Sequence, residues 1–158
     1  LLGPVTAVLA LNIYRQRQLL KEYFFPVLAG CFTGCLTSLG SILLLCKLLS
    51  VDSVIASSLL PKSVTTAIAV AISDSNGGIQ GITVTAVLVA GVIGAIFAPL
   101  FAKLFRVTDP VAEGVAIGAC SHALGTSKAM EIGALQGAMS SIALCVCGIM
   151  TSIIIMFF

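Results

Sequence analysis

Residues 75–102, SNGGIQGITVTAVLVAGVIGAIFAPLFA, contain no charged side chain. A helix needs about 20 predominantly apolar residues to cross roughly 30 Å of hydrocarbon, because it rises ~1.5 Å per residue. Two further blocks, residues 23–46 and 132–158, also lack charge. The sequence therefore predicts at least three membrane-spanning helices.

The composition supports the same conclusion. Hydrophobic residues make up 59% of the chain and charged residues 9%, and the mean hydropathy is +1.18. In a soluble domain about a quarter of the residues are charged. We therefore expect an integral, multi-pass protein of the inner or plasma membrane rather than a soluble enzyme. The net charge of +2 is too small and too scattered to indicate nucleic-acid binding.

The sequence offers little support for catalysis or metal binding. Its six cysteines lie almost wholly within apolar blocks, where small packing residues are common. A metal site would need further ligands, yet the only histidine is His122. Its neighbour Ser121 would point about 100° away on a helix, so the two side chains do not pair easily as nucleophile and base. We predict no catalytic residue, no metal and no cofactor.

Two apolar segments are interrupted by polar residues or proline. Residues 53–73 are broken near Pro61, which suits the first position of a new helix. Residues 110–130 contain a second polar and glycine-rich break. Each follows a full span, at about 24–46 and 82–102.

The chain therefore repeats one unit, at about 24–72 and 81–130, before a final span at 134–158. We predict a single membrane domain over residues 1–158. Its fold class is an all-α polytopic membrane helix bundle with two discontinuous or re-entrant segments, arranged as an inverted repeat.

The basic residues indicate how the two units face. Cytoplasmic loops collect Lys and Arg, which assigns the basic cluster at 15–21 to the inside. If residues 53–73 dip into the membrane and return, Lys103 and Arg106 also lie inside. If the broken segments cross fully, these two charges fall outside, so charge favours re-entrant segments and opposite orientations.

Paired broken helices in inverted repeats are typical of secondary transporters. A helix that starts within the membrane leaves N–H groups unpaired, which is tolerable where they line a wet cavity and attract an anion. The two breaks thus predict a site for a small carboxylate, with Lys62 supplying charge. The candidate binding residues are Lys62, Ser63, Thr65, Thr66, Ser121, His122, Gly125 and Thr126.

Each candidate also has a structural interpretation. Serine and threonine hydroxyls in membrane helices commonly bond to their own backbone carbonyls. Lys62 would extend to the interface if Pro61 lies near the membrane surface. His122 is more typical of a packed, hydrogen-bonded residue than of a proton relay.

Two motifs, LPKSVTT at 60–66 and SHALGT at 121–126, resemble the LrgB/CidB family, the holin/antiholin-like murein hydrolase regulators that include YohK-type proteins. The resemblance extends from Leu2-Gly3-Pro4 to Cys147-Gly148-Ile149. The sequence departs from it at Asn12 and Ala67, where the family often has proline.

This resemblance implies a multi-pass cytoplasmic-membrane protein that partners a small LrgA/CidA-type membrane protein. Bacterial members are linked to autolysis and programmed cell death. Members are similar to the plant plastidial glycolate/glycerate transporter, and some bacterial pairs are tied to pyruvate uptake. Members carry further N-terminal helices, which implies that this chain is a C-terminal part and that residues 1–14 are the tail of a helix.

Three hypotheses follow. The first is a transporter of small monocarboxylates such as glycolate, glycerate or pyruvate, with the two broken segments forming the site. The second is a holin/antiholin-like membrane protein that modulates murein hydrolase activity and autolysis. The third is a structural subunit of its small partner. We also expect a homo-oligomer within the lipid bilayer.

Overall fold

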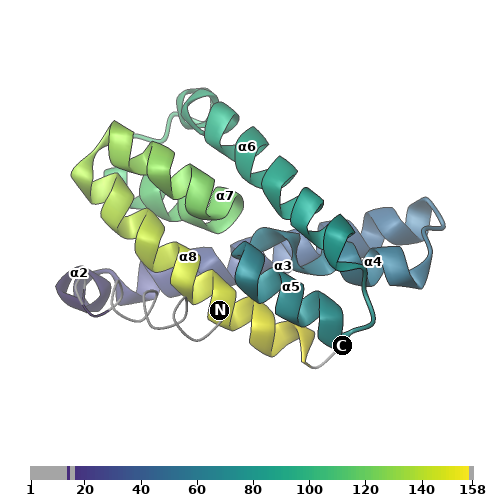
Figure 1. The fold of residues 1–158 in the computed structure, drawn as a ribbon. Coiled ribbons are helices and arrows are strands. Elements are labelled where there is room, and N and C mark those ends of the chain that lie inside the picture. Colours follow the sequence, from purple (N-terminus) through teal and green to yellow (C-terminus); the bar gives the residue numbers. More distant parts are fainter. Residues whose placement is uncertain (1–13, 15–16, 157–158) are drawn as a thin grey trace.

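The computed structural model describes Tyr14 and residues 17–156, and this part of the chain contains helices and no strand (Figure 1). The all-α prediction is therefore confirmed. The expected helix tail at residues 1–14 lies outside the described residues, apart from Tyr14. The elements are α2 (Arg17–Glu22), α3 (Phe24–Leu48), α4 (Ser53–Leu59), the 3₁₀ helix η1 (Leu60–Ser63), α5 (Thr66–Ser75), α6 (Gln80–Leu104), α7 (Pro110–Ile132) and α8 (Ala134–Ile155).

Within the described residues, α3, α6 and α8 are long and apolar enough to cross a membrane. They contain 25, 25 and 22 residues, which corresponds to roughly 33–38 Å of helix. Their bounds lie close to those that the uncharged blocks predict. Hydrophobic block length therefore determines these three elements.

The first interrupted segment breaks after η1. Val64 and Thr65 are extended, and α5 begins at Thr66. The new helix thus starts at Thr66 rather than at Pro61, which corrects the prediction. Pro61 instead lies within the 3₁₀ turn, while the β-branched Val64 and Thr65 favour an extended backbone. Val64 is 1% exposed and packs against a small apolar cluster with Ala69 of α5 and Val87 of α6.

A buried group of hydroxyls shows that this segment doubles back. Ser58 in α4, Ser73 in α5 and Thr83 in α6 are each 0% exposed. Thr83 Oγ1 lies 2.9 Å from the Ser58 carbonyl oxygen and 2.7 Å from Ser73 Oγ, and the Ile79 N–H donates to Ser58 Oγ at 2.7 Å. The ends of α4 and α5 are thereby joined to the first turns of α6.

The second interrupted segment is α7. Asp109 caps its start by accepting a hydrogen bond from the Val111 N–H at 2.9 Å. The helix geometry fails at one residue, His122, whose φ of 47° and ψ of −136° are not helical. The second break is therefore a sharp kink at His122. The inverted orientation of the two units stays a prediction.

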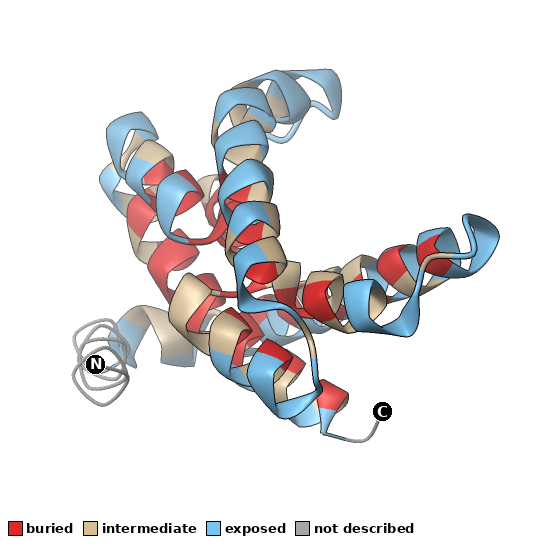
Figure 2. Cartoon of the chain, turned by 45° about the vertical axis from the view of Figure 1, so that its right-hand side comes forward, coloured by how far each residue is buried: buried red, intermediate tan, exposed pale blue. Residues whose placement is uncertain are grey.

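Helix α8 is central and α6 is peripheral. Of the apolar stretch of each helix, 61% is buried in α8 but 17% in α6. Buried residues lie on the inward faces of the helices, whereas much of α6 is exposed (Figure 2). The main core joins α3, α7 and α8 around Met139 and includes Cys31, Cys35 and Cys147. These three thiols pack between α3 and α8, as expected of small apolar residues.

Close contact between α7 and α8 requires glycine. A Cβ atom added at Gly118 would lie 2.3 Å from the Ser140 carbonyl oxygen, and one at Gly114 would lie 2.6 Å from the Gln136 carbonyl oxygen. Both neighbours are backbone atoms, which cannot rotate away. The two glycines thus permit α7 and α8 to approach closely, as small residues do in membrane helix pairs.

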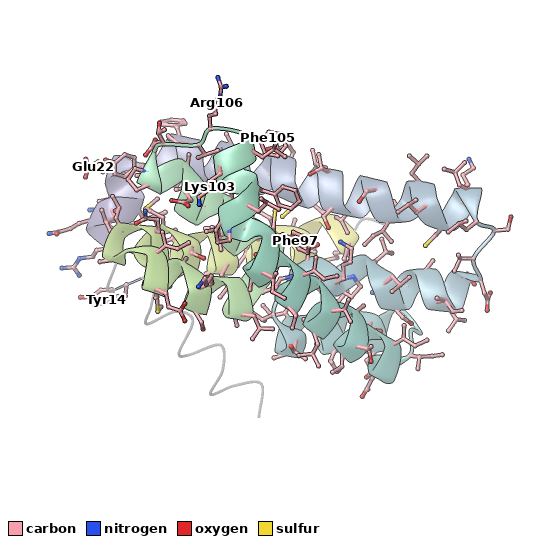
Figure 3. All side chains as sticks on the ribbon, turned by 90° about the horizontal axis from the view of Figure 1, so that it is seen from above. Tyr14, Glu22, Phe97, Lys103, Phe105 and Arg106 are labelled. Atoms are coloured by element: carbon pink, nitrogen blue, oxygen red, sulfur yellow. The ribbon has the colours of Figure 1, made fainter. Side chains whose placement is uncertain are left out.

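The basic residues at the end of α6 lie at the same end of the molecule as the start of the described chain (Figure 3). Figure 3 shows Lys103 and Arg106, at the end of α6, at the same end of the molecule as Tyr14 and Glu22. Tyr23 and Asp109 line one hollow between the starts of α3 and α7. The placement of both ends on the inside of the membrane stays a prediction.

We predict that Gly118→Ala destabilises the protein by about 1–3 kcal/mol, because overpacking of a tight contact costs that much. Gly40→Ala is the matched control, since a Cβ atom there meets nothing within 4 Å. Thermal unfolding in detergent, followed by circular dichroism, measures the change. Equal melting temperatures for the two variants would contradict the packing argument.

Candidate functional site

The two breaks meet inside the molecule. The η1 turn contacts α3, α6, α7 and α8. Lys62, in that turn, is close enough to interact electrostatically with both Cys120 and His122 of α7. Chain segments that are well separated in sequence thus bring a cation and an imidazole to one place.

Ser38 of α3 completes the surroundings of Lys62. The Lys62 ammonium lies 3.4 Å from Ser38 Oγ, which also forms a hydrogen bond with Ser63 Oγ. Ser38 was not among the predicted residues. Ser38 could have been found as a polar residue beside Cys35 and Leu39, which are buried on the inward face of α3.

The position of Ser38 also places Lys62 along the membrane-length helix. Ser38 lies near the middle of α3, which runs from Phe24 to Leu48. The Lys62 ammonium beside it is therefore far from both ends of α3. This location favours the buried-site interpretation of Lys62 over extension to the interface.

Two buried polar atoms in the described part of the chain have no hydrogen-bond partner, His122 Nε2 and Thr65 Oγ1. Each belongs to one of the two breaks. Buried polar groups are nearly always hydrogen-bonded, and His122 is only 3% exposed. Its positive φ is also costly for a residue with a side chain. Neither atom has a hydrogen bond in the described part of the chain to offset the cost of its burial.

The other predicted residues of α7 support the kink. Ser121 Oγ donates to the Ile117 carbonyl oxygen at 2.9 Å. Thr126 Oγ1 donates to the His122 carbonyl oxygen at 2.8 Å and lies 2.9 Å from Ser140 Oγ in α8. A Cβ atom added at Gly125 would lie 2.3 Å from Ser121 Cβ, so glycine leaves room for Ser121. These contacts are internal to the protein.

The predicted set therefore divides into three groups. Lys62, Ser63 and His122 lie together with Ser38, whereas Ser121, Gly125 and Thr126 stabilise the backbone around His122. Thr65 and Thr66 lie at the start of α5, and the Thr65 side chain makes no capping hydrogen bond there. The role of these residues in binding a substrate stays a prediction.

Two hollows adjoin this site. A groove of about 670 Å³ is lined by Leu59 and Lys62 together with residues of α6 from Gly81 to Ala90. A smaller hollow of about 150 Å³ lies between α6 and α7 and includes Cys120 and Ser121. Lys62 borders the first hollow and its neighbour Cys120 borders the second.

The arrangement suits a small anion. The site combines an ammonium group, two hydroxyls and an imidazole with an open nitrogen, and the uncapped start of α5 is nearby. Charged and hydrogen-bonding donors of this kind bind carboxylates. Among the described residues, no group of three or more His, Cys, Asp or Glu side chains is placed to hold a metal ion.

These features define a helical membrane protein with two interrupted helices that meet at a polar site. Comparison with known proteins gives the family. The LrgB-like family matches residues 1–158, and the chain belongs to it. The resemblance seen in the two motifs is thereby confirmed.

The relatives include the antiholin-like protein LrgB of Bacillus subtilis (strain 168), which is 39% identical over 154 residues, or 98% of this chain and 67% of the relative. The antiholin-like protein LrgB of Bacillus mycoides (strain KBAB4) is 39% identical over 157 residues, or 99% of this chain and 68% of the relative. The chain spans about two thirds of the length of these relatives. No solved structure matches it.

We predict that Gly125→Ala destabilises the protein because the new methyl group overlaps Ser121, and that adding Ser121→Gly recovers most of the loss. The double-mutant cycle in thermal unfolding should give a coupling energy of about 0.5–3 kcal/mol, as for residues in contact. Additive effects would show that Gly125 is needed for another reason.

Proposed function

We propose that this chain is an antiholin-like protein of the inner or plasma membrane that modulates murein hydrolase activity and autolysis. Two findings support this proposal. The chain belongs to the LrgB-like family, and relatives named antiholin-like protein LrgB align with 98–99% of its length. We propose a multi-pass arrangement, which the three membrane-length helices support. The proposed role requires no chemical reaction, so the chain is not an enzyme.

We further propose that the molecular activity behind this role is the binding and passage of small monocarboxylates, such as glycolate, glycerate or pyruvate. The observation that carries this proposal is the meeting of Lys62 and His122, one from each interrupted helix, near the middle of α3. An ionisable residue inside a membrane protein is a functional-site candidate because its burial is costly. Here the cost is offset when a carboxylate pairs with Lys62.

The exposed apolar surface of α6 indicates what this helix contacts in the membrane. The outward face of α6 carries large apolar side chains, among them Leu88, Val92 and Ile96. We propose that lipid, a second copy of the chain and a small LrgA/CidA-type membrane protein cover this face. Both the family resemblance and the low burial of α6 support this proposal.

The test is uptake of labelled glycolate, glycerate and pyruvate into liposomes that contain the chain, alone and with its small partner. Lys62→Gln should lower uptake by about 10–100-fold, because a hydrogen bond to a charged group contributes about 1.5–3 kcal/mol. Lys128→Gln is the matched control, since the Lys128 side chain is 41% exposed and pairs with Glu131 at 2.7 Å. Melting temperatures of both variants establish that they fold.

The outcomes separate the hypotheses. Selective uptake that depends on Lys62 supports the carboxylate site. Leakage of a neutral sugar that is unaffected by Lys62→Gln supports an unselective holin-like pore and contradicts transport. Flux that requires the small companion protein identifies this chain as its subunit. Autolysis that is unchanged when the chain is expressed in cells would contradict the antiholin-like role.

A further inference from the structure

We propose that the hollow between α6 and α7 binds the apolar end of a carboxylate whose charged end lies at Lys62. This inference rests on the proposed carboxylate site and narrows its substrate class to acids with an alkyl group. The hollow has a volume of about 150 Å³ and reaches Cys120, the neighbour of Lys62. Lys62 itself lines the adjoining groove, so a bound acid would extend from that groove past Cys120 into this hollow.

The two ends of the hollow differ in charge. Gly94, Cys120 and Ser121 form its inner end, where a Cβ atom added at Gly94 would lie 2.5 Å from Ser121 Cβ. Phe105 and Glu113 lie toward the outer end. Glu113 and Cys120 are seven residues apart on α7, which corresponds to about 10 Å.

This polarity sets the direction of a bound acid. Lys62 attracts a carboxylate to the inner end, whereas the negative charge of Glu113 disfavours one at the outer end. Glu113 accepts a hydrogen bond from Gln136 Nε2 at 3.2 Å, which holds its carboxylate toward α8. The alkyl group would then extend from Cys120 along α6 toward Phe101.

The lining between these ends suits an alkyl group. It consists largely of small and apolar side chains, including Ala98, Phe101, Ala102 and Ala116. An apolar cavity of about 150 Å³ binds a benzene molecule, so this hollow has room for roughly four to six carbon atoms. The hydroxyl groups of glycerate would find few partners there, and burying an unpaired hydroxyl is unfavourable.

Cys120 provides the experiment with a reporter. It is exposed, whereas Cys31, Cys35, Cys46, Cys145 and Cys147 are buried. The rate at which N-ethylmaleimide alkylates the purified chain should therefore report on Cys120, and Cys120→Ser should remove the fast reaction. A ligand in the hollow slows it.

We expect acetate, butyrate and hexanoate to protect Cys120 with increasing affinity, by roughly fourfold for each added methylene that the hollow buries. Glycerate should protect more weakly than butyrate. Ala98→Phe and Ala116→Leu fill the hollow and should abolish the gain from acetate to hexanoate while leaving acetate protection in place. Ala95→Phe is the control, because Ala95 is also half-buried on α6 but does not line the hollow.

Three results would overturn the inference in different ways. Equal protection by acetate, butyrate and hexanoate, lost in Lys62→Gln, would leave the carboxylate site standing and refute the alkyl pocket. Absence of protection by any carboxylate would refute the proposed site together with the pocket. Retained chain-length dependence in both filled variants would place the alkyl group elsewhere and also refute the pocket.

Discussion

Hydrocarbon offers no hydrogen bonds, so a helix that stops inside a membrane must have its free backbone groups covered by protein or by water. The break at Val64 and Thr65 meets this constraint by being surrounded. The Val64 N–H donates to the Pro61 carbonyl oxygen at 3.3 Å, and η1 contacts four long helices. The buried hydroxyls of Ser58, Ser73 and Thr83 then hold the returning segment against α6.

The need to satisfy every buried polar group also separates the polar residues of the two breaks into two kinds. Ser121 and Thr126 satisfy their hydroxyls with carbonyls of their own helix, which makes them part of the structure around His122. His122 Nε2 and Thr65 Oγ1 have no such partner. A hydroxyl near a membrane break is thus no sign of a binding site until its own hydrogen bonds are counted. Of the two, His122 also lies beside Lys62, and this pair carries the functional argument.

Much of the fold could be predicted because its strongest determinant is local. Uninterrupted apolar blocks predicted α3, α6 and α8, and proline and glycine indicated that the other two segments are interrupted without locating the breaks at Val64–Thr65 and His122. The restart of α5 at Thr66 could not be predicted, because it depends on Val64 packing against Val87 of α6. For the site, Lys62 and His122 were identifiable as ionisable residues in apolar surroundings. Ser38 was missed because its role depends on η1 lying against α3, a contact between segments that no local pattern encodes.

The strain at His122 bears on the choice between a selective site and a wide pore. A non-glycine residue at φ 47° costs about 1–3 kcal/mol, and such conformations persist only where the surrounding structure fixes them. Here Gly125, Ser121 and Thr126 are all arranged around that one residue, and Ser140 of α8 adds a further contact. An unselective aqueous opening requires no fixed imidazole and no strained backbone. The proposed site must hold one anion against water and requires its donors in fixed positions, so the strain at His122 supports a selective site over a wide pore.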